Sequence, residues 1–376
     1  MKKHLRSILA LVLVVALLSS TIGCTKTPTT TDSSANTTGP RTVTVTDMSG
    51  DSVTVVGEVK RIINLWPAGT SSFFALGAGD LIVGMASSGA NSNAWSKFLY
   101  PNIVNIPGVG GTTPTVEDLI NLNPDLVIIH PSTAASGFAQ QIRNVGIPAI
   151  NINFDGYETM RQAYTILGEV LGGVYQQKLN DWCTATDSKI SNVRRLTAGL
   201  SDADRPVVFY IAGQSNSMTS TMTHDSIFSD WVESAGGKYA TRIMNLTGTS
   251  ATAEAIFALN PDVFIVGGVW QHVIKNDILT TSGWKDLKPV VNNRLYTNPY
   301  ACFNWDRFGL ESQLQINYAL LCIQPTIAAA NGINRDSMID EIVAFYSKYT
   351  NVTMTRQQAG YMLDGFGPDG TAENSV

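Results

Sequence analysis

Residues 115–129 read TVEDLINLNPDLVII, and residues 252–266 repeat the phrase as TAEAIFALNPDVFIV. Seven of the fifteen positions are identical, and corresponding residues lie 137 positions apart. In each copy an acidic amphipathic segment predicts a helix start, Leu-Asn-Pro-Asp predicts its end, and the following apolar run predicts a buried parallel strand. A period this long exceeds that of solenoid repeats, which is a few tens of residues. The phrase therefore predicts two copies of one α/β lobe, with a cleft where they face each other.

The segments around the two copies alternate strand and helix patterns, which is the rhythm of a parallel sheet. Before the first copy, a hairpin is expected over residues 42–47 and 52–56, and a helix is expected to open at Pro67. Further strands are expected at 61–65, 81–85, 149–152, 206–211 and 294–296. Further helices are expected near 139–145 and over 310–321, 335–349 and 355–363.

The middle of the chain has a different texture. Residues 157–171 and 175–200 carry helical periodicity, with only a Gly-Gly pair and Val174 between them and no strand. The second segment predicts one helix of about 26 residues, or about 39 Å. The two ends of such a helix would fall in different lobes.

The first 24 residues predict an export signal. Lys2, Lys3 and Arg6 precede an apolar run over residues 8–18, which is too short to span a bilayer. The run ends at Thr-Ile-Gly-Cys24, which resembles a bacterial lipoprotein signal with a lipidated cysteine; ordinary secretion is the alternative. Residues 25–41 are rich in Thr, Ser, Asn and Pro and predict a disordered tether. We therefore expect a protein anchored by lipid at the extracytoplasmic face of the cell membrane.

Charge and motifs exclude several classes of protein. Without the three basic signal residues the formal charge falls from −5 to −8, which argues against a nucleic-acid partner. No GxSxG, HExxH, P-loop or strand-linked GxGxxG motif occurs, so an enzyme is not expected. Three cysteines follow Cys24, namely Cys183, Cys302 and Cys322, and we expect unpaired thiols, with a Cys302–Cys322 bridge as the alternative.

Several short motifs together carry a family resemblance. They are TDMSG at 46–50, ALGAGDLIVG at 75–84, the two repeated phrases, ESAGG at 233–237, Gly283-Trp284 with Leu287, and NRLY at 293–296. In this order and spacing the chain resembles the substrate-binding lipoproteins of ABC importers for ferric siderophores, haem and cobalamin, the class III periplasmic binding proteins. The resemblance covers residues 43–325.

The resemblance implies two Rossmann-like lobes with central parallel sheets, joined by one long rigid helix that permits only slight closure. The expected domains are an N-terminal lobe (42–172), the connecting helix (173–200) and a C-terminal lobe (201–376). The implied partners are an ABC permease with its ATPase and a small-molecule metal chelate. In this family one glutamate of each lobe docks onto the permease, and the matching residues are Glu117 and Glu254. As acids in a first helical turn, both also fit a purely structural role.

Ligand-binding residues are expected in the loops that follow the strands, because α/β sheets bind ligands there. Aromatic side chains gather in these loops, which suggests a stacking pocket, although a single aromatic after a strand is more often part of the core. These aromatic residues are Trp66, Trp95, Tyr210, Trp270, Tyr300, Phe303 and Trp305.

Three histidines and one arginine complete the expected site. His130, His224 and His272 lie at predicted cleft edges, where one of them could complete the coordination of a chelated metal or serve as an axial ligand to haem. Direct binding of a free metal ion is not expected. Arg307 could pair an anionic chelate, unless Asp306 beside it neutralises the charge.

These observations predict a solute-binding protein that captures an iron chelate, a ferric siderophore, and delivers it to a permease. No intrinsic cofactor is expected, since the iron belongs to the ligand. A haem- or cobalamin-binding protein of the same importer class is the alternative, and a cell-surface enzyme on a bilobal fold is a remote one.

Overall fold

The computed structural model describes residues 40–130, 137–153 and 155–372. The predicted signal with Cys24 and most of the predicted tether lie outside these residues. Contacts group Pro40–Val376 into one unit. Among the described helices, none has both the length and the apolar character needed to cross a bilayer.

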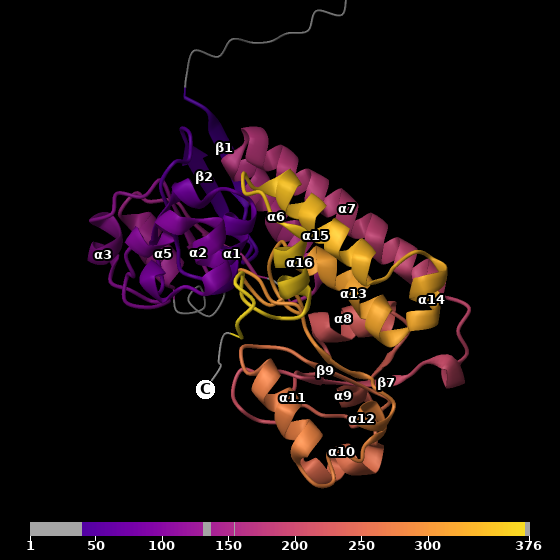
Figure 1. Cartoon of the computed structure of the whole chain (residues 1–376). Helices are drawn as coiled ribbons and strands as arrows, with labels where there is room; N and C mark the ends of the chain where they lie inside the picture. Colours follow the sequence, from indigo (N-terminus) through magenta and orange to yellow (C-terminus); the bar gives the residue numbers. More distant parts are fainter. Residues whose placement is uncertain (1–39, 131–136, 154, 373–376) are drawn as a thin grey trace, which may run out of the picture. The chain divides into compact units, whose positions relative to one another are not determined.

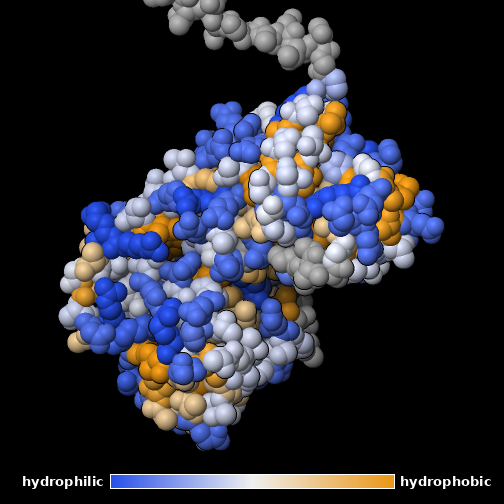
Figure 2. Space-filling view, turned by 180° about the vertical axis from the view of Figure 1, so that it is seen from behind, coloured by the Kyte–Doolittle hydropathy of each residue, from blue (hydrophilic) through white to orange (hydrophobic). Residues whose placement is uncertain are grey.

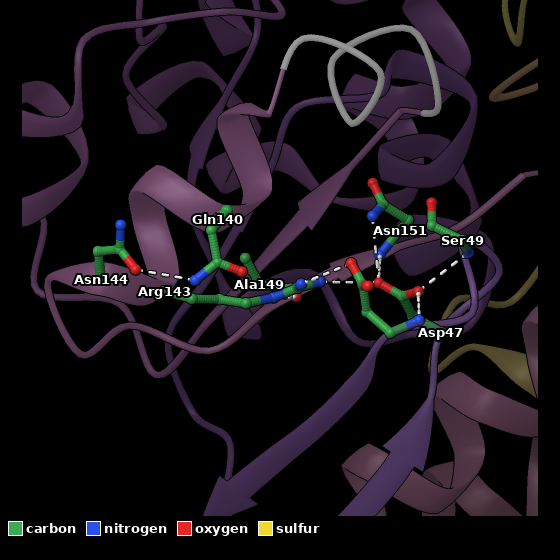
Figure 3. A network of polar contacts seen from close by, with 8 residues as sticks. Asp47, Ser49, Gln140, Arg143, Asn144, Ala149 and Asn151 are labelled. Atoms are coloured by element: carbon green, nitrogen blue, oxygen red, sulfur yellow. Dashed lines mark hydrogen bonds and ion pairs between the residues drawn. The ribbon is translucent and has the colours of Figure 1, made fainter.

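The predicted hairpin is present as the antiparallel pair β1 (Thr42–Thr46) and β2 (Ser52–Val56). A polar network fastens its turn to the first sheet (Figure 3). The Arg143 guanidinium donates to Asp47 at 2.9 Å and to Asp51 at 2.7 Å. Asp47 also accepts the backbone N–H of Asn151 at 3.0 Å. The carboxylate of Asp47 is buried, and these donors satisfy it.

The first sheet is parallel, with strand order β4-β3-β5-β6. Its strands are β3 (Ile62–Asn64), β4 (Ile82–Met85), β5 (Leu126–Ile129) and β6 (Ala149–Asn151). Its helices are α1 (Pro67–Ala75), α2 (Ala94–Leu99), α3 (Val116–Ile120) and α5 (Phe138–Asn144). Every residue of β5 is buried, as predicted from its uninterrupted apolar run.

The second sheet is also parallel, with strand order β10-β9-β7-β8. Its strands are β7 (Val207–Ile211), β8 (Lys238–Tyr239), β9 (Val263–Val266) and β10 (Leu295–Thr297). Its helices are α8 (Ile227–Ser234), α9 (Ala240–Ile243), α10 (Ala253–Leu259), α11 (Gln271–Thr280) and α12 (Lys288–Val291). Each copy of the repeated phrase thus supplies one short helix and one buried strand, α3 with β5 and α10 with β9.

The asparagine of the repeated phrase turns the chain after both short helices: Asn260 is the C-cap of α10, and Asn123 follows the end of α3 by three positions. Asn123 and Asn260 have φ values of 44° and 43°, in the left-handed region that asparagine tolerates better than most residues. A proline follows each of them and prevents the helix from continuing. This shared local chemistry explains why Asn-Pro occurs at the same point in both copies.

The aspartate of the repeated phrase holds the neighbouring strand. Asp125 accepts the backbone N–H groups of Lys60 and Arg61 at 2.8 and 2.9 Å, directly before β3. In the second copy, Asp262 accepts the N–H of Val207 at 2.8 Å, at the start of β7. The phrase therefore attaches its own strand to the first strand of each sheet.

Two helices without an intervening strand follow the first sheet, as predicted: α6 (Tyr157–Leu171) and α7 (Gly173–Thr197). Figure 1 shows α7 as the longest helix of the chain portion described, and its length is 25 residues. Near its start, Lys178 donates to the carbonyl of Leu76 at 3.1 Å, at the end of α1. At its end, Thr197 donates to the carbonyl of Ser234 at 3.0 Å, in α8. The two ends of α7 therefore contact different parts of the protein, here called the first half, which contains the first sheet, and the second half, which contains the second sheet.

The C-terminal part is helical, with α13 (Ser312–Ile323), α14 (Pro325–Ala330), α15 (Arg335–Tyr349) and α16 (Arg356–Leu363). Helix α13 packs on α7, where Trp182 donates to the carbonyl of Leu310 at 2.7 Å and stacks edge-on against Tyr164 of α6. Cys183, Cys302 and Cys322 are free thiols, as expected, so Cys302 and Cys322 form no bridge.

The predicted fold class is confirmed: the chain is α/β, with two parallel sheets in two lobes and one long helix between them. The expected domain boundaries at 172 and 200 stay a prediction.

Candidate functional site

A pocket of about 180 Å³ lies at the carboxyl ends of β3 and β4. Helix α1, the segment from Met85 to Ser96, and Cys302 with Phe303 from the second half line it. Its polar side chains are all uncharged: Thr70, Ser71, Ser87, Ser88, Asn91, Ser92, Asn93 and Ser96. The other lining residues are Pro67, Phe74, Met85 and Ala86. This is the edge of a parallel sheet at which α/β proteins bind ligands.

The two hydroxyl groups of α1 that line the pocket donate their protons to backbone carbonyls of the same helix or of its N-cap. Thr70 donates to the carbonyl of Trp66 at 3.1 Å, and Ser71 donates to the carbonyl of Ala68 at 2.7 Å. A hydroxyl has one proton and two lone pairs, so the groups that remain are acceptors. This wall of the pocket is therefore suited to a ligand group that donates hydrogen bonds.

Asn93 brings the second half to the pocket. Its Nδ2 lies 2.8 Å from the Tyr300 hydroxyl, 3.1 Å from the carbonyl of Ala301 and 2.9 Å from that of Cys302. Its Oδ1 accepts the N–H of Ser96 at 2.7 Å and caps α2. The Asn93 side chain thus holds both α2, which contributes Ser96 to the pocket, and the loop that follows β10.

Glu311 holds the same loop from behind. Its buried carboxylate accepts the N–H groups of Cys302 and Phe303 at 3.2 and 3.3 Å and the hydroxyl proton of Tyr346. Burial raises the pKa of Glu311 to about 7, although the three donors act against this rise. Two residues of the pocket wall therefore depend on a carboxyl group that titrates near neutrality.

Arg307, expected to pair an anionic ligand, is neutralised inside the second half. Its guanidinium donates to Asp306 at 2.7 Å and to the Tyr210 hydroxyl at 2.8 Å, and Tyr210 itself donates to Asp306 at 2.6 Å. All three residues are buried. Burial alone would lower the pKa of Arg307, but the Asp306 carboxylate and Tyr210 raise it above its usual range. A side chain on Gly267, after β9, would lie 2.2 Å from Asp306, so this cluster also requires a glycine there.

His272 is occupied by the turn that residues 364–367 form after α16, here called the C-terminal turn. Its Nε2 lies 2.9 Å from the carbonyl of Gly365, and its ring stacks on Phe366 with centroids 4.1 Å apart. Burial lowers the pKa of His272. The same turn reaches the first half, because Trp95 donates its indole N–H to the carbonyl of Phe366 at 2.8 Å. Both residues were expected to contact a ligand, and in this structure both hold the C-terminal turn.

His130 lies beside Trp66, with ring centroids 5.3 Å apart, and Trp66 also contacts Phe308 of the second half at 5.6 Å. His130 is only partly buried, and burial lowers its pKa. A neutral imidazole is the form that ligates metals. The geometry is therefore compatible with the expected role of His130 as a completing or axial ligand.

The other expected ligand residues are dispersed. Trp305 is completely buried in the core, and Trp270 is partly buried at the start of α11. His224 pairs with Asp225 at 3.0 Å. Tyr300 is buried and faces Asn93. Ligand contact by these residues stays a prediction. Across the described ranges, no group of three or more His, Cys, Asp or Glu side chains is placed to hold a metal ion.

Glu117 and Glu254 are exposed in the first turns of α3 and α10. An exposed apolar side chain follows each glutamate by three positions and so lies on the same helix face: Ile120 and Phe257. Figure 2 shows an apolar patch near the lower end of the molecule, where Figure 1 places α10 and α12. Both copies of the phrase therefore present an acid beside an apolar group to solvent.

Sequence reasoning missed Thr70, Ser71, Ser96 and Glu311. The signal for the first two was the Thr-Ser-Ser run after Pro67, at a predicted strand end. Nothing in the sequence marks Glu311, which acts through backbone groups eight and nine positions before it.

The family model described as "Periplasmic binding protein" matches residues 62–301, more than half of the chain. A Bacillus subtilis (strain 168) protein, the "Uncharacterized ABC transporter substrate-binding lipoprotein YvrC", is 27% identical over 261 residues, covering 68% of this chain and 77% of that protein. A "Cobalamin-binding protein" of Halobacterium salinarum is 25% identical over 233 residues, covering 60% of this chain and 58% of that protein.

Among solved structures, a periplasmic solute binding protein from Veillonella parvula DSM 2008 superposes with a TM-score of 0.73 at 22% identity. The match covers 88% of this chain and 99% of that chain. At this level of identity the likeness shows a shared fold and nothing further.

Proposed function

Because the chain belongs to the periplasmic binding protein family and is a solute-binding protein of an ABC transporter, we propose that its solute is a metal chelate, first of all a ferric siderophore. Membership also confirms the resemblance drawn from the short motifs and the expectation of a binding protein rather than an enzyme. The family alone does not name the solute, since a fold does not determine its ligand.

The observation that most supports a chelate is the pocket at the ends of β3 and β4, which both halves line. A volume of about 180 Å³ is smaller than the roughly 300–1,000 Å³ of a typical small-molecule site. A large ligand would therefore place one arm in this pocket and lie partly outside it. His130, partly buried at the end of β5 beside the buried Trp66, offers an imidazole for the rest of the ligand.

Haem and corrinoids are the second candidate. His130 favours them as a source of an axial nitrogen, because its pKa is lowered by burial. The cobalamin-binding relative of Halobacterium salinarum supports the corrinoid in particular.

A thermal-shift panel tests the proposal. We expect one ligand among a ferric siderophore set, haemin and cyanocobalamin to stabilise the protein by about 2.7 kcal/mol at a concentration 100 times its Kd. Failure of all of them at high micromolar concentration would overturn the chelate proposal. The visible spectrum of material that copurifies from the host gives a second readout, because ferric chelates, haem and corrinoids absorb differently.

We further propose that the protein is held at the extracytoplasmic face of the cell membrane by lipid on Cys24, and that Glu117 and Glu254 dock onto the permease. The lipoprotein relative supports the anchor, and the exposed, matching positions of the two glutamates support docking.

Uptake by the reconstituted importer tests docking. We expect Glu117→Ala with Glu254→Ala to abolish most transport while ligand affinity is unchanged. Glu158→Ala is the matched control, because Glu158 is also an exposed acid in a first helical turn. Equal transport by the double variant and the control would rule out docking through these residues. For the anchor, Cys24→Ala should release the protein from the membrane fraction.

A further inference from the structure

We infer that the pocket beside α1 receives an uncharged, amide-bearing arm of the ligand, so that the ligand is a neutral ferric hydroxamate or a corrinoid and not an anionic chelate. The inference rests on the proposed function and narrows its substrate class. Three properties of the described residues carry it: the charge of the pocket, the direction of its hydroxyl groups, and its size.

The first property is charge. No lysine, arginine, histidine, aspartate or glutamate is among the residues that line the pocket. Arg307, the one arginine expected to pair with an anionic ligand, instead donates hydrogen bonds to Asp306 and Tyr210 in the core. An anionic group that entered this pocket would lose hydration without gaining a cation, which is costly.

The second property is the direction of the hydrogen bonds. Thr70 and Ser71 donate their protons to the carbonyls of Trp66 and Ala68 and so present lone pairs. Haem propionates and catecholate oxygens only accept hydrogen bonds, so they find no donor at Thr70 and Ser71 and could accept only from the other hydroxyls of the lining. An amide N–H supplies the donor that this wall lacks, and the amide carbonyl can accept from other hydroxyls of the lining.

The third property is size. Primary carboxamide side chains project from the rim of a corrinoid ring, and amide linkages join the arms of a peptide or chain hydroxamate. One such arm fits a pocket of about 180 Å³, in which Phe74 and Phe303 contact its aliphatic part. The ring or metal centre then remains outside the pocket.

The test measures the affinity of four ligands by isothermal titration calorimetry, with the protein from residue 25 onward, which lacks the predicted signal and Cys24. The ligands are cyanocobalamin, an uncharged ferric trihydroxamate, a ferric tricatecholate and haemin. We expect one of the first two to bind, and the anionic pair to bind at least 100-fold more weakly. Tighter binding of the tricatecholate or haemin would overturn the inference and leave the proposed function intact. Binding of none of the four would overturn the proposed function itself. The two failures are therefore distinguishable, and the titration also separates the hydroxamate source of the amide from the corrinoid source.

Three variants locate the arm. Thr70→Val and Ser71→Ala each remove an acceptor, and we expect each to weaken the bound neutral ligand by about twofold to tenfold. Ser72→Ala is the control, because Ser72 also donates to Ala68 but faces the Tyr164 hydroxyl at 2.9 Å and does not line the pocket. Its affinity should equal that of the unmodified protein. Unchanged affinity in both pocket variants would overturn the placement of the arm, even if a neutral ligand binds.

Discussion

The two halves of the chain start from the same phrase but use the side chains at their strand ends differently. In the first half, hydroxyl and amide groups after β3 and β4 line a pocket. In the second half, Tyr210, Asp306 and Arg307 bond to one another in the core, and His272 bonds to the C-terminal turn. Two halves with the same strand order and the same repeated phrase can therefore differ in what the side chains after their strands contact. The first half exposes uncharged polar groups to a pocket, whereas the second half pairs its charged groups with one another inside the core.

The largest expected effect tests whether the charged groups of the second half stabilise the fold, and it comes from removing one partner of the buried ion pair. Arg307→Met leaves the Asp306 carboxylate buried without its cation, and we expect a loss of about 3–5 kcal/mol in the free energy of unfolding, measured by denaturant titration. The double variant Asp306→Asn with Arg307→Met should recover much of the loss. If Arg307→Met instead lowered ligand affinity and left stability unchanged, Arg307 would belong to the ligand site and the contrast between the halves would disappear.

A pH titration sharpens the comparison where the halves meet. Burial raises the pKa of Glu311 to about 7 in the folded protein, above its ordinary value of 4.5. The folded state therefore retains the proton longer than the unfolded chain. This contribution to stability is complete below about pH 4.5 and is lost as the pH rises to about 7, a change of about 3 kcal/mol.

Glu311→Gln should remove this component, so the unfolding free energies of variant and parent should diverge between about pH 4.5 and about pH 7. His130 and His272, whose pKa values are lowered, change stability in the opposite direction, but they are present in both proteins and cancel in the difference. Parallel pH curves for the two proteins would contradict the role assigned to Glu311.

A smaller effect separates the two copies of the phrase themselves. Asp125 accepts two backbone N–H groups and Asp262 accepts one, so we expect Asp125→Ala to cost about 2 kcal/mol and Asp262→Ala about 1 kcal/mol. Asp125→Asn, which retains an acceptor oxygen, is the control and should cost less than Asp125→Ala. Equal losses in the two alanine variants would mean that the number of bonded N–H groups does not set the effect.

The smallest expected effect concerns His272. Phe366→Ala removes the ring stacked on its imidazole, so the burial that lowers the pKa of His272 decreases and the pKa should rise toward its ordinary value. Proton NMR titration of the histidine ring signals measures this shift. The pKa of His130, which lies against Trp66, should not move. A fixed His272 pKa would show that Phe366 does not shield it.

Much of the fold was predictable because its signals are local. The apolar runs of β5 and β9, the Asn-Pro break before each, and the long periodicity of α7 each depend on neighbouring residues. The hairpin and its Ser-Gly turn followed from the same kind of pattern.

The site was less predictable because its chemistry depends on directions and on distant partners. The sequence shows that Thr70 and Ser71 are polar, but the carbonyls that take their protons are fixed only by the helix. Asp306 beside Arg307 indicated an ion pair, yet burial of that pair requires Tyr210, almost a hundred positions earlier. The contact of His272 with the C-terminal turn spans 93 positions and has no local signal.

The bond between Trp95 and the carbonyl of Phe366 joins residues 271 positions apart, and Asn93 reaches Cys302 over 209. Closing loops of this length has an entropic cost that only a largely assembled protein offsets. Until the C-terminal part of the chain has folded, these contacts beside the pocket cannot form. Capacity to bind should therefore arise late in folding, after the last helices have been added, and not when the hydroxyl-lined helix forms.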